Sequence, residues 1–290
     1  MIHKIAKWCL LFLFTLVTQA HADCPRIISQ SPYITHQLDY LGLKTCLVGS
    51  SRYNPELGLP TTGGLLDPDA HAIAELQADL WITSDWTKQR DFDAIQPTVK
   101  HALRLQSFGS MQQIEDNLME VAKASGQPAA LQKAQDFPAQ WRRKAQEVRS
   151  LNPTSPKVLL ISSCSGQPYA FGRDAFLSDL FTQMGFEIVG KPQRITHLPI
   201  TPQQNALEAL IAELQPQIVF IFERQLAPAC QLMQLPKGTR IITLDGTHFL
   251  QPAPLLITAM QRFEQQWRRD DFGLRKLHDL HDKTLIKHQE

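Results

Sequence analysis

Residues 75–82 read ELQADLWI and residues 213–222 read ELQPQIVFIF. In each stretch, a segment with helical character runs directly into a short segment that is almost wholly apolar. An apolar segment of this length between polar residues is typical of a strand buried on both faces, as in a parallel sheet. The two stretches therefore predict helix–strand units in two separate parts of the chain.

The same alternation continues on either side of these two stretches. Helical segments separate the apolar segments. Two of the helical segments end at Gly42 and Gly185, since glycine is the usual residue just beyond a helix. Alternation of this kind favours parallel sheets with helices on both faces, which is an α/β fold. The further strands that we predict are residues 26–29, 46–49, 99–105, 158–161, 186–189 and 241–244.

Residues 110–152 interrupt the alternation, because they contain no strand signal. Two helices are expected there, separated by Gly126-Gln127-Pro128, and Pro138 is expected to bend the second because a proline inside a helix removes a backbone donor. We therefore predict two α/β lobes with mainly parallel sheets, joined by one long helix, and a ligand cleft between the lobes. The expected boundaries are residues 1–22 for a signal peptide, 23–109 and 153–269 for the lobes, 110–152 for the bridge and 270–290 for a polar tail.

The composition is that of a globular protein, with 43% hydrophobic and 20% charged residues in a chain of 290. These values exclude a disordered chain, a collagen-like fibre and a membrane protein with many spans. The formal net charge of +1 at pH 7 gives the molecule no overall electrostatic footprint for nucleic acid.

The first residues have the pattern of a cleavable secretory signal peptide. Lys4 and Lys7 precede the apolar run of residues 8–17, and Ala20-His21-Ala22 supplies small residues before the expected cleavage site. The apolar run is short for a membrane-spanning helix, which needs about 20 residues. We therefore expect an exported mature protein that begins at Asp23.

Export places the remaining cysteines in an oxidising compartment, where an even number favours disulfides. Cys24 and Cys46 lie at the starts of two strands that are expected to be parallel neighbours. Cys164 and Cys230 each follow a strand in the second lobe. We expect the pairs Cys24–Cys46 and Cys164–Cys230, and the alternative is four buried thiols.

Candidate ligand-binding residues follow from the rule that ligands of open parallel sheets lie beyond the carboxyl ends of the strands. Aromatic side chains at these positions offer flat apolar contact to a large planar ligand, and an arginine can pair with its carboxylates or phosphates. The alternative is that some of these side chains belong to the core or to surface ion pairs. The candidates are Tyr33, Tyr53, Trp86, Tyr169, Phe171, Arg224, His248 and Phe249.

Six segments follow one another in a recognisable order and spacing: residues 26–32 (RIISQSP), 41–49 (LGLKTCLVG), 53–55 (YNP), 62–64 (TGG), 74–82 (AELQADLWI) and 214–219 (LQPQIV). Together they resemble the periplasmic solute-binding proteins of ABC importers for cobalamin, haem and ferric siderophores. The resemblance extends over residues 26–267, and Ala78 stands where this family usually has proline.

The resemblance implies two lobes bridged by a stiff helix, with a metal chelate bound between them and little closure. It implies delivery of the chelate to an ABC permease in the inner membrane. We expect no resident cofactor, no nucleic-acid partner and no enzymatic activity. Trp86 falls where cobalamin binders of the family place a cleft aromatic, and Phe171 falls in a comparable loop of the second lobe.

The resemblance also implies that a glutamate on each lobe docks onto the permease. The matching positions here are His71 and Ala209, which departs from the family pattern. Asp67, Asp69 and the neighbouring Glu208 are the expected substitutes, so we predict docking through Asp69, His71 and Glu208. Service to a divergent permease or a binding role outside transport are the alternatives.

Three other hypotheses make different use of the side chains. A free zinc or manganese ion would need ligands such as His36, His71, Asp245 and His248. A haem could take an axial ligand from Tyr33, His36, Tyr53 or His71. An enzyme could use a Cys164–His248 pair, but the chain lacks the G-x-S-x-G and phosphate-binding glycine motifs, and an oxidised cysteine is a poor nucleophile.

Overall fold

The structure is a computed structural model that describes residues 24–106, 108–163, 167–201, 204–223 and 236–269. The predicted signal peptide, the predicted Cys164–Cys230 pair, Arg224 and the polar tail lie outside the described residues. Among the described residues, none of the helices combines the length and the apolar character that crossing a membrane requires.

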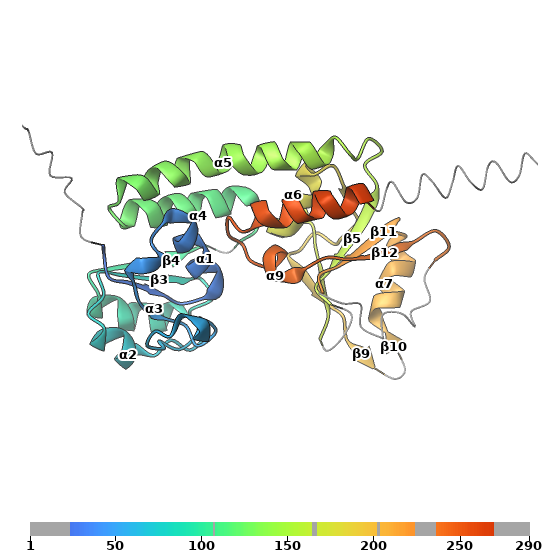
Figure 1. The fold of residues 1–290 in the computed structure, drawn as a ribbon. Helices are drawn as coiled ribbons and strands as arrows, with labels where there is room; N and C mark the ends of the chain where they lie inside the picture. Colours follow the sequence, from blue (N-terminus) through green and yellow to red (C-terminus); the bar gives the residue numbers. More distant parts are fainter. Residues whose placement is uncertain (1–23, 107, 164–166, 202–203, 224–235, 270–290) are drawn as a thin grey trace, which may run out of the picture.

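The N-terminal lobe is built on a parallel sheet with the strand order β2-β1-β3-β4. Its strands are β1 (Ile27–Ser29), β2 (Leu47–Ser50), β3 (Leu80–Ser84) and β4 (His101–Leu105). Helices α1 (Pro32–Leu41), α2 (Ala70–Glu75) and α3 (Gln89–Ile95), with the 3-10 turns η1 (Lys44–Cys46), η2 (Pro55–Leu57) and η3 (Gln96–Thr98), connect the strands (Figure 1).

Local sequence explains where α1 begins and ends. The Ser31 hydroxyl accepts a hydrogen bond from the amide of Ile34, which satisfies one of the free donors at the helix start. Gly42 follows the last turn with a φ of 82°, a left-handed conformation that glycine adopts without steric cost. The short α1 therefore places Ser31, Pro32 and Tyr33 at the carboxyl end of β1.

The C-terminal lobe is built on a mixed sheet with the order β12-β11-β5-β6-β8, and β7 also pairs with β5. Strands β5, β7, β11 and β12 are parallel, whereas β6 is antiparallel to β5 and β8. Its strands are β5 (Lys157–Ile161), β6 (Tyr169–Phe171), β7 (Glu187–Ile188), β8 (Ile195–His197), β11 (Ile218–Ile221) and β12 (Arg240–Thr243), with a separate β9 (Ile200–Thr201) and β10 (Gln204–Asn205) pair. Its helices are α6 (Phe176–Gln183), α7 (Ala206–Leu214), α9 (Gly246–Phe249) and residues 256–269.

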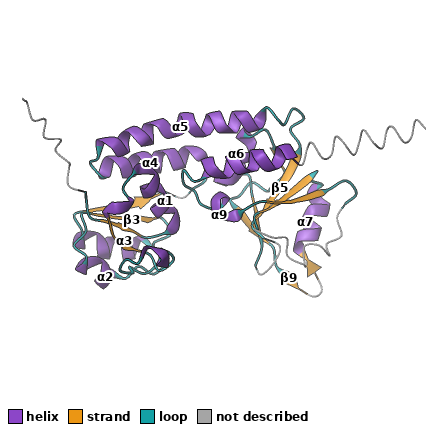
Figure 2. Ribbon diagram, in the orientation of Figure 1, coloured by secondary structure: helices purple, strands orange, loops and turns teal. Residues whose placement is uncertain are grey.

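Helix α5 (Pro128–Arg149) lies across both lobes, and α4 (Met111–Ala124) runs beside it over the N-terminal lobe and contacts α6 (Figures 1 and 2). Helix α5 contacts α1 of the N-terminal lobe and α6 of the C-terminal lobe, and it continues through Pro138. Glu115 of α4 accepts a hydrogen bond from the Trp141 indole at 2.7 Å and pairs with Arg142 at 2.7 Å, so the two helices are also joined by polar contacts. The predicted α/β fold, with two mainly parallel sheets, is confirmed.

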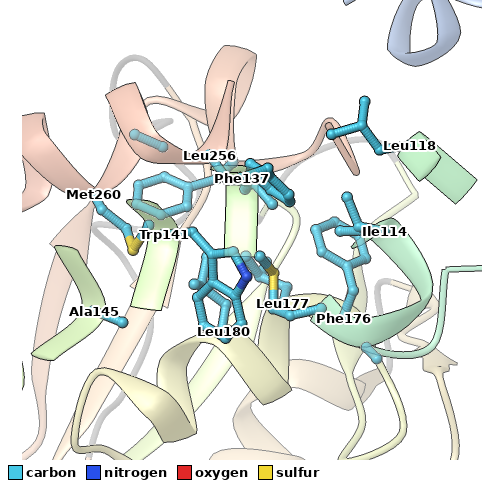
Figure 3. Close-up of a cluster of buried hydrophobic side chains, with 14 of the residues drawn as sticks. Ile114, Leu118, Phe137, Trp141, Ala145, Phe176, Leu177, Leu180, Leu256 and Met260 are labelled. Atoms are coloured by element: carbon cyan, nitrogen blue, oxygen red, sulfur yellow. The ribbon is translucent and has the colours of Figure 1, made fainter. Parts of the chain in front are cut away.

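The bridge shares its core with the C-terminal lobe. Side chains of α4, α5, α6 and residues 256–269 pack into one cluster, in which nearly all are excluded from solvent. Figure 3 shows this cluster close up, with Ile114, Leu118, Phe137, Trp141, Ala145, Phe176, Leu177, Leu180, Leu256 and Met260 labelled. Because the same cluster also contains side chains of α1, the hydrophobic core runs continuously from one lobe to the other.

The predicted Cys24–Cys46 disulfide is present and ties the start of the described chain to the residue before β2. The two cysteines are separated by 22 positions, and a loop of this size restricts the unfolded chain. We expect the double variant Cys24→Ala/Cys46→Ala to lose about 3 kcal/mol of unfolding free energy, measured by urea titration. Reduced wild-type protein is the control, and equal midpoints for oxidised and reduced wild type would contradict this expectation.

Candidate functional site

The two lobes face each other across a cavity of about 1060 Å³. Its N-terminal side is formed by residues that follow β1, β2 and β3, together with Leu65, Leu66 and Asp67 of the loop before α2. Its C-terminal side is formed by β6, β8, the start of α6 and residues 250–252. The cavity therefore opens where the carboxyl ends of the N-terminal strands meet the edge of the second sheet.

Three of the predicted aromatic residues lie on the N-terminal side. Tyr33, Tyr53 and Trp86 each come shortly after a strand end, as the topology rule requires. Trp86 is 59% exposed and Tyr53 is 65% exposed. Tyr33 is held more tightly, because its ring packs edge-on against Phe108 with centroids 4.7 Å apart, and burial raises the pKa of Tyr33 to about 12.

The C-terminal side contains a wall made by the antiparallel β6–β8 pair. Tyr169 lies opposite His197 and Phe171 lies opposite Ile195 in the ladder. Side chains alternate between the two faces of a strand, so all four share one face, and all four line the cavity. The Tyr169 and Phe171 ring centroids are 5.2 Å apart, and those of Tyr169 and His197 are 6.3 Å apart. We call these four residues the C-terminal wall.

Few charged groups reach the cavity. Asp67 on the N-terminal side is paired with Arg52, whose guanidinium lies 2.8 Å from its carboxylate. Arg194, directly before β8, is an exposed lining residue, and its guanidinium makes no ion pair with the residues that the structure describes. The lining is otherwise dominated by aromatic and aliphatic side chains.

Two predicted residues lie away from the cavity. Phe249 is 3% exposed and packs in the aromatic core, 5.6 Å from the ring of Phe181. His248 lies on the same short helix α9 and faces Asp245 at 3.5 Å and Arg262 at 3.3 Å. Helix α9 begins directly after Asp245, which caps it, so its single turn directs Phe249 into the core rather than toward the cleft.

The candidate ligands for a free metal ion are dispersed. Within the described ranges, no group of three or more His, Cys, Asp or Glu side chains is placed to hold an ion. His71 is exposed on α2 and pairs with Glu75 at 3.3 Å, and His36 lies half-buried on α1. Of the four predicted axial ligands for haem, Tyr33 and Tyr53 line the cavity, whereas His36 and His71 do not.

Sequence reasoning missed Arg194, Ile195 and His197, which belong to or adjoin β8. The segment Ile195-Thr196-His197-Leu198 does not alternate strictly between apolar and polar residues, so the sequence carries no strand signal there. It also missed Leu65, Leu66, Phe108 and residues 250–252, which lie in loops without a local pattern.

Residues 27–227 match the family model described as periplasmic binding protein. The chain belongs to the periplasmic binding protein family. The resemblance found in the sequence is thereby confirmed, and a search of the curated proteins gives no match.

Solved structures support the same fold. A periplasmic heme-binding protein of Roseiflexus sp. RS-1 is 19% identical with a TM-score of 0.66, covering 84% of this chain and 97% of its own. The periplasmic vitamin B12 binding protein of Vibrio cholerae is 17% identical with a TM-score of 0.66, covering 84% and 96%. A periplasmic heme-binding protein of Pseudomonas aeruginosa is 20% identical with a TM-score of 0.65, covering 84% and 92%.

The predicted docking residues of this periplasmic binding protein lie on α2 and α7. Asp69 caps α2 by accepting hydrogen bonds from the amides of His71 and Ala72. Glu208 lies in the first turn of α7. Both helices lie on the side of the lobes away from α5 (Figure 1), and the role of these residues in docking stays a prediction.

The half-buried His36 predicts a pH dependence of stability. Burial is the main cause that lowers the pKa of His36 below its ordinary 6.5, with nearby Lys44 acting in the same direction and Asp39 opposing it. The unfolded chain therefore binds the proton more tightly, and the unfolding free energy falls as the pH drops below 6.5 toward the native pKa. We expect His36→Gln to flatten this fall in urea titrations at about pH 7.5 and about pH 5. Parallel curves for the variant and the wild type would contradict it.

Proposed function

We propose that this periplasmic binding protein captures a bulky planar metal chelate, a tetrapyrrole such as a corrinoid or a haem, between its lobes. It then delivers the chelate to an ABC importer of the inner membrane. One observation carries the proposal: among the described residues, the large apolar side chains that are exposed all line the cavity. These side chains are Tyr53 (65%), Leu66 (66%), Trp86 (59%) and Ile195 (42%).

Exposed apolar surface gathered in one concave site is typical of a ligand-binding cleft. The cavity volume of about 1060 Å³ lies just above the usual range for pockets that bind drug-sized ligands, so it suits a large ligand. Aromatic rings come from both lobes, with Trp86 and Tyr53 on one side and Tyr169 and Phe171 on the other. Such rings offer flat contact to the faces of a macrocycle.

The charge of the lining favours a tetrapyrrole over a ferric siderophore. Recognition of an anionic siderophore calls for several arginines. Arg52 pairs with Asp67 but does not itself line the cavity, so Arg194 is the one arginine among the described lining residues. The similar structures include a heme-binding protein and a vitamin B12 binding protein, which supports the same class.

Trp86→Ala tests this function. Loss of a central aromatic contact typically costs about 2 kcal/mol, so we expect roughly thirtyfold weaker binding of the tetrapyrrole. The measurement is a titration of purified protein with haemin and with cyanocobalamin by calorimetry. Trp86→Phe is the matched control, since it keeps a flat ring and should retain most of the affinity. If wild-type protein binds neither chelate, the proposed function is wrong.

A further inference from the structure

The segment from Arg194 to His197 brings two polar groups to a cavity that is otherwise largely apolar. Arg194 and His197 both line the cavity, and both side chains are exposed. The β8 register fixes His197, because its pairing with Tyr169 places it on the cavity face of the ladder. Thr196 lies between them in the sequence and pairs with Ala170, so it points to the other face.

His197 is the one histidine among the described residues that line this cavity, and within the described ranges it belongs to no group of three or more His, Cys, Asp or Glu side chains that could hold an ion. A free metal ion in a protein needs several such ligands. A metal that arrives inside a macrocycle already has its ring nitrogens and needs only an axial ligand from the protein. One accessible imidazole in an apolar cleft therefore fits a chelated metal better than a free ion.

The phenols of the cavity are weaker candidates for the same task. A phenol must lose its proton to bind a metal as phenolate, and its ordinary pKa is about 10. Burial raises the pKa of Tyr33 to about 12, and the ring of Tyr169 packs edge-on against Phe171 with centroids 5.2 Å apart. Asp67 is held by Arg52. This leaves Tyr53, on the opposite side of the cavity, as the competing donor.

Arg194 adds a second chemical preference. Its guanidinium is unpaired within the described part of the chain, and a guanidinium matches the geometry of a carboxylate. Porphyrins such as haem carry carboxylates, whereas cobalamin carries amides. The cobalt of cyanocobalamin also has both axial positions filled, so it has no place for an imidazole of the protein.

We propose, building on the proposed function, that the ligand is a carboxylate-bearing metalloporphyrin with an open axial position, such as haem. His197 coordinates its metal from the C-terminal wall, and Arg194 binds one of its carboxylates. Arg194 and His197, at the two ends of one short segment, thereby select a porphyrin over a corrinoid.

The experiment titrates purified protein with haemin, metal-free protoporphyrin and cyanocobalamin, followed by absorption spectroscopy. We expect haemin to bind tightest and to give the spectrum of a nitrogen-ligated iron. His197→Ala should weaken haemin at least about tenfold, since loss of only an outer ligand partner already costs that much. The same variant should leave protoporphyrin binding unchanged, and added imidazole should restore the spectrum.

Arg194→Gln should weaken haemin and protoporphyrin alike, by about tenfold for one charge-assisted contact. His101→Ala and Arg173→Gln are the matched controls, because both side chains are exposed and lie outside this cavity. Tyr53→Phe should leave the iron spectrum unchanged. Urea titration of each variant checks that the fold is intact.

The outcomes separate this inference from the proposed function. If haemin binds but His197→Ala leaves its spectrum and affinity unchanged, or Tyr53→Phe changes the spectrum instead, the assignment of His197 is wrong and the proposed function stands. Tighter binding of cyanocobalamin than of haemin also overturns the inference alone. If neither chelate binds, the proposed function fails and the inference with it.

Discussion

Replacing Phe181 by alanine should lower the unfolding free energy by about 3–5 kcal/mol, the usual cost of removing a buried aromatic ring. Phe181 is fully buried at the centre of the C-terminal aromatic core. Its ring centroid lies between 5.3 and 5.9 Å from those of its neighbours, so the cavity left behind would be surrounded by large rings. These neighbours are Phe186, Phe220, Phe222, Phe249 and Phe263.

Removal of the Phe181 ring should also loosen the side chains that line the ligand cavity. Phe222 touches both Phe181 and Phe171, with ring centroids 5.9 Å apart in each pair, so the aromatic core supports the C-terminal wall. Urea titration measures the effect, and Leu66→Ala is the control because this side chain is 66% exposed. A loss below about 1 kcal/mol for Phe181→Ala would show that the core collapses around the gap.

Replacing Gly172 by alanine should damage both stability and ligand binding. A Cβ atom at this position would lie 1.8 Å from the carbonyl oxygen of Gln193 and 2.6 Å from that of Lys191. Both contacts are backbone atoms, which cannot rotate away. The segment that leads into β8 must therefore move, at a cost of about 1–3 kcal/mol or more.

That movement matters for function because the amide of Gly172 donates to the carbonyl of Arg194 at 2.9 Å. Displacing this segment shifts Arg194 and His197, so we expect weaker haemin binding together with a lower urea midpoint. Gly109→Ala is the matched control, since its Cβ would meet the flexible end of Gln113 at 3.2 Å. Wild-type affinity and stability for Gly172→Ala would contradict the described packing of β6 against this segment.

The strand-end rule predicted much of the site. Tyr33, Tyr53, Trp86, Tyr169 and Phe171 come from distant parts of the sequence, and the structure brings them together at one cavity. The rule works for Tyr33, Tyr53 and Trp86 because the connections leaving the carboxyl ends of parallel strands gather at one edge of the sheet. Tyr169 and Phe171 lie instead on the antiparallel strand β6, so the expectation that Phe171 falls in a loop is wrong. Their roles in ligand binding stay predictions.

Other parts of the site depend on non-local packing that the sequence pattern does not encode. The rule placed Phe249 near a strand end, but the single turn of α9 directs its ring into the core. Strand β8 is only three residues long and is held by β6, so its existence depends on a partner far along the chain. His197 was missed for that reason, although it is one of the four residues of the C-terminal wall.

The central claim is that the interlobe cavity binds a planar metal chelate. The most direct measurement is calorimetry of wild-type protein with haemin, cyanocobalamin and zinc or manganese ions in separate titrations. We predict saturable binding of a tetrapyrrole, with one molecule per chain and micromolar or tighter affinity, and no comparable binding of the free ions. Tight binding of a free ion together with no uptake of either tetrapyrrole would contradict the account.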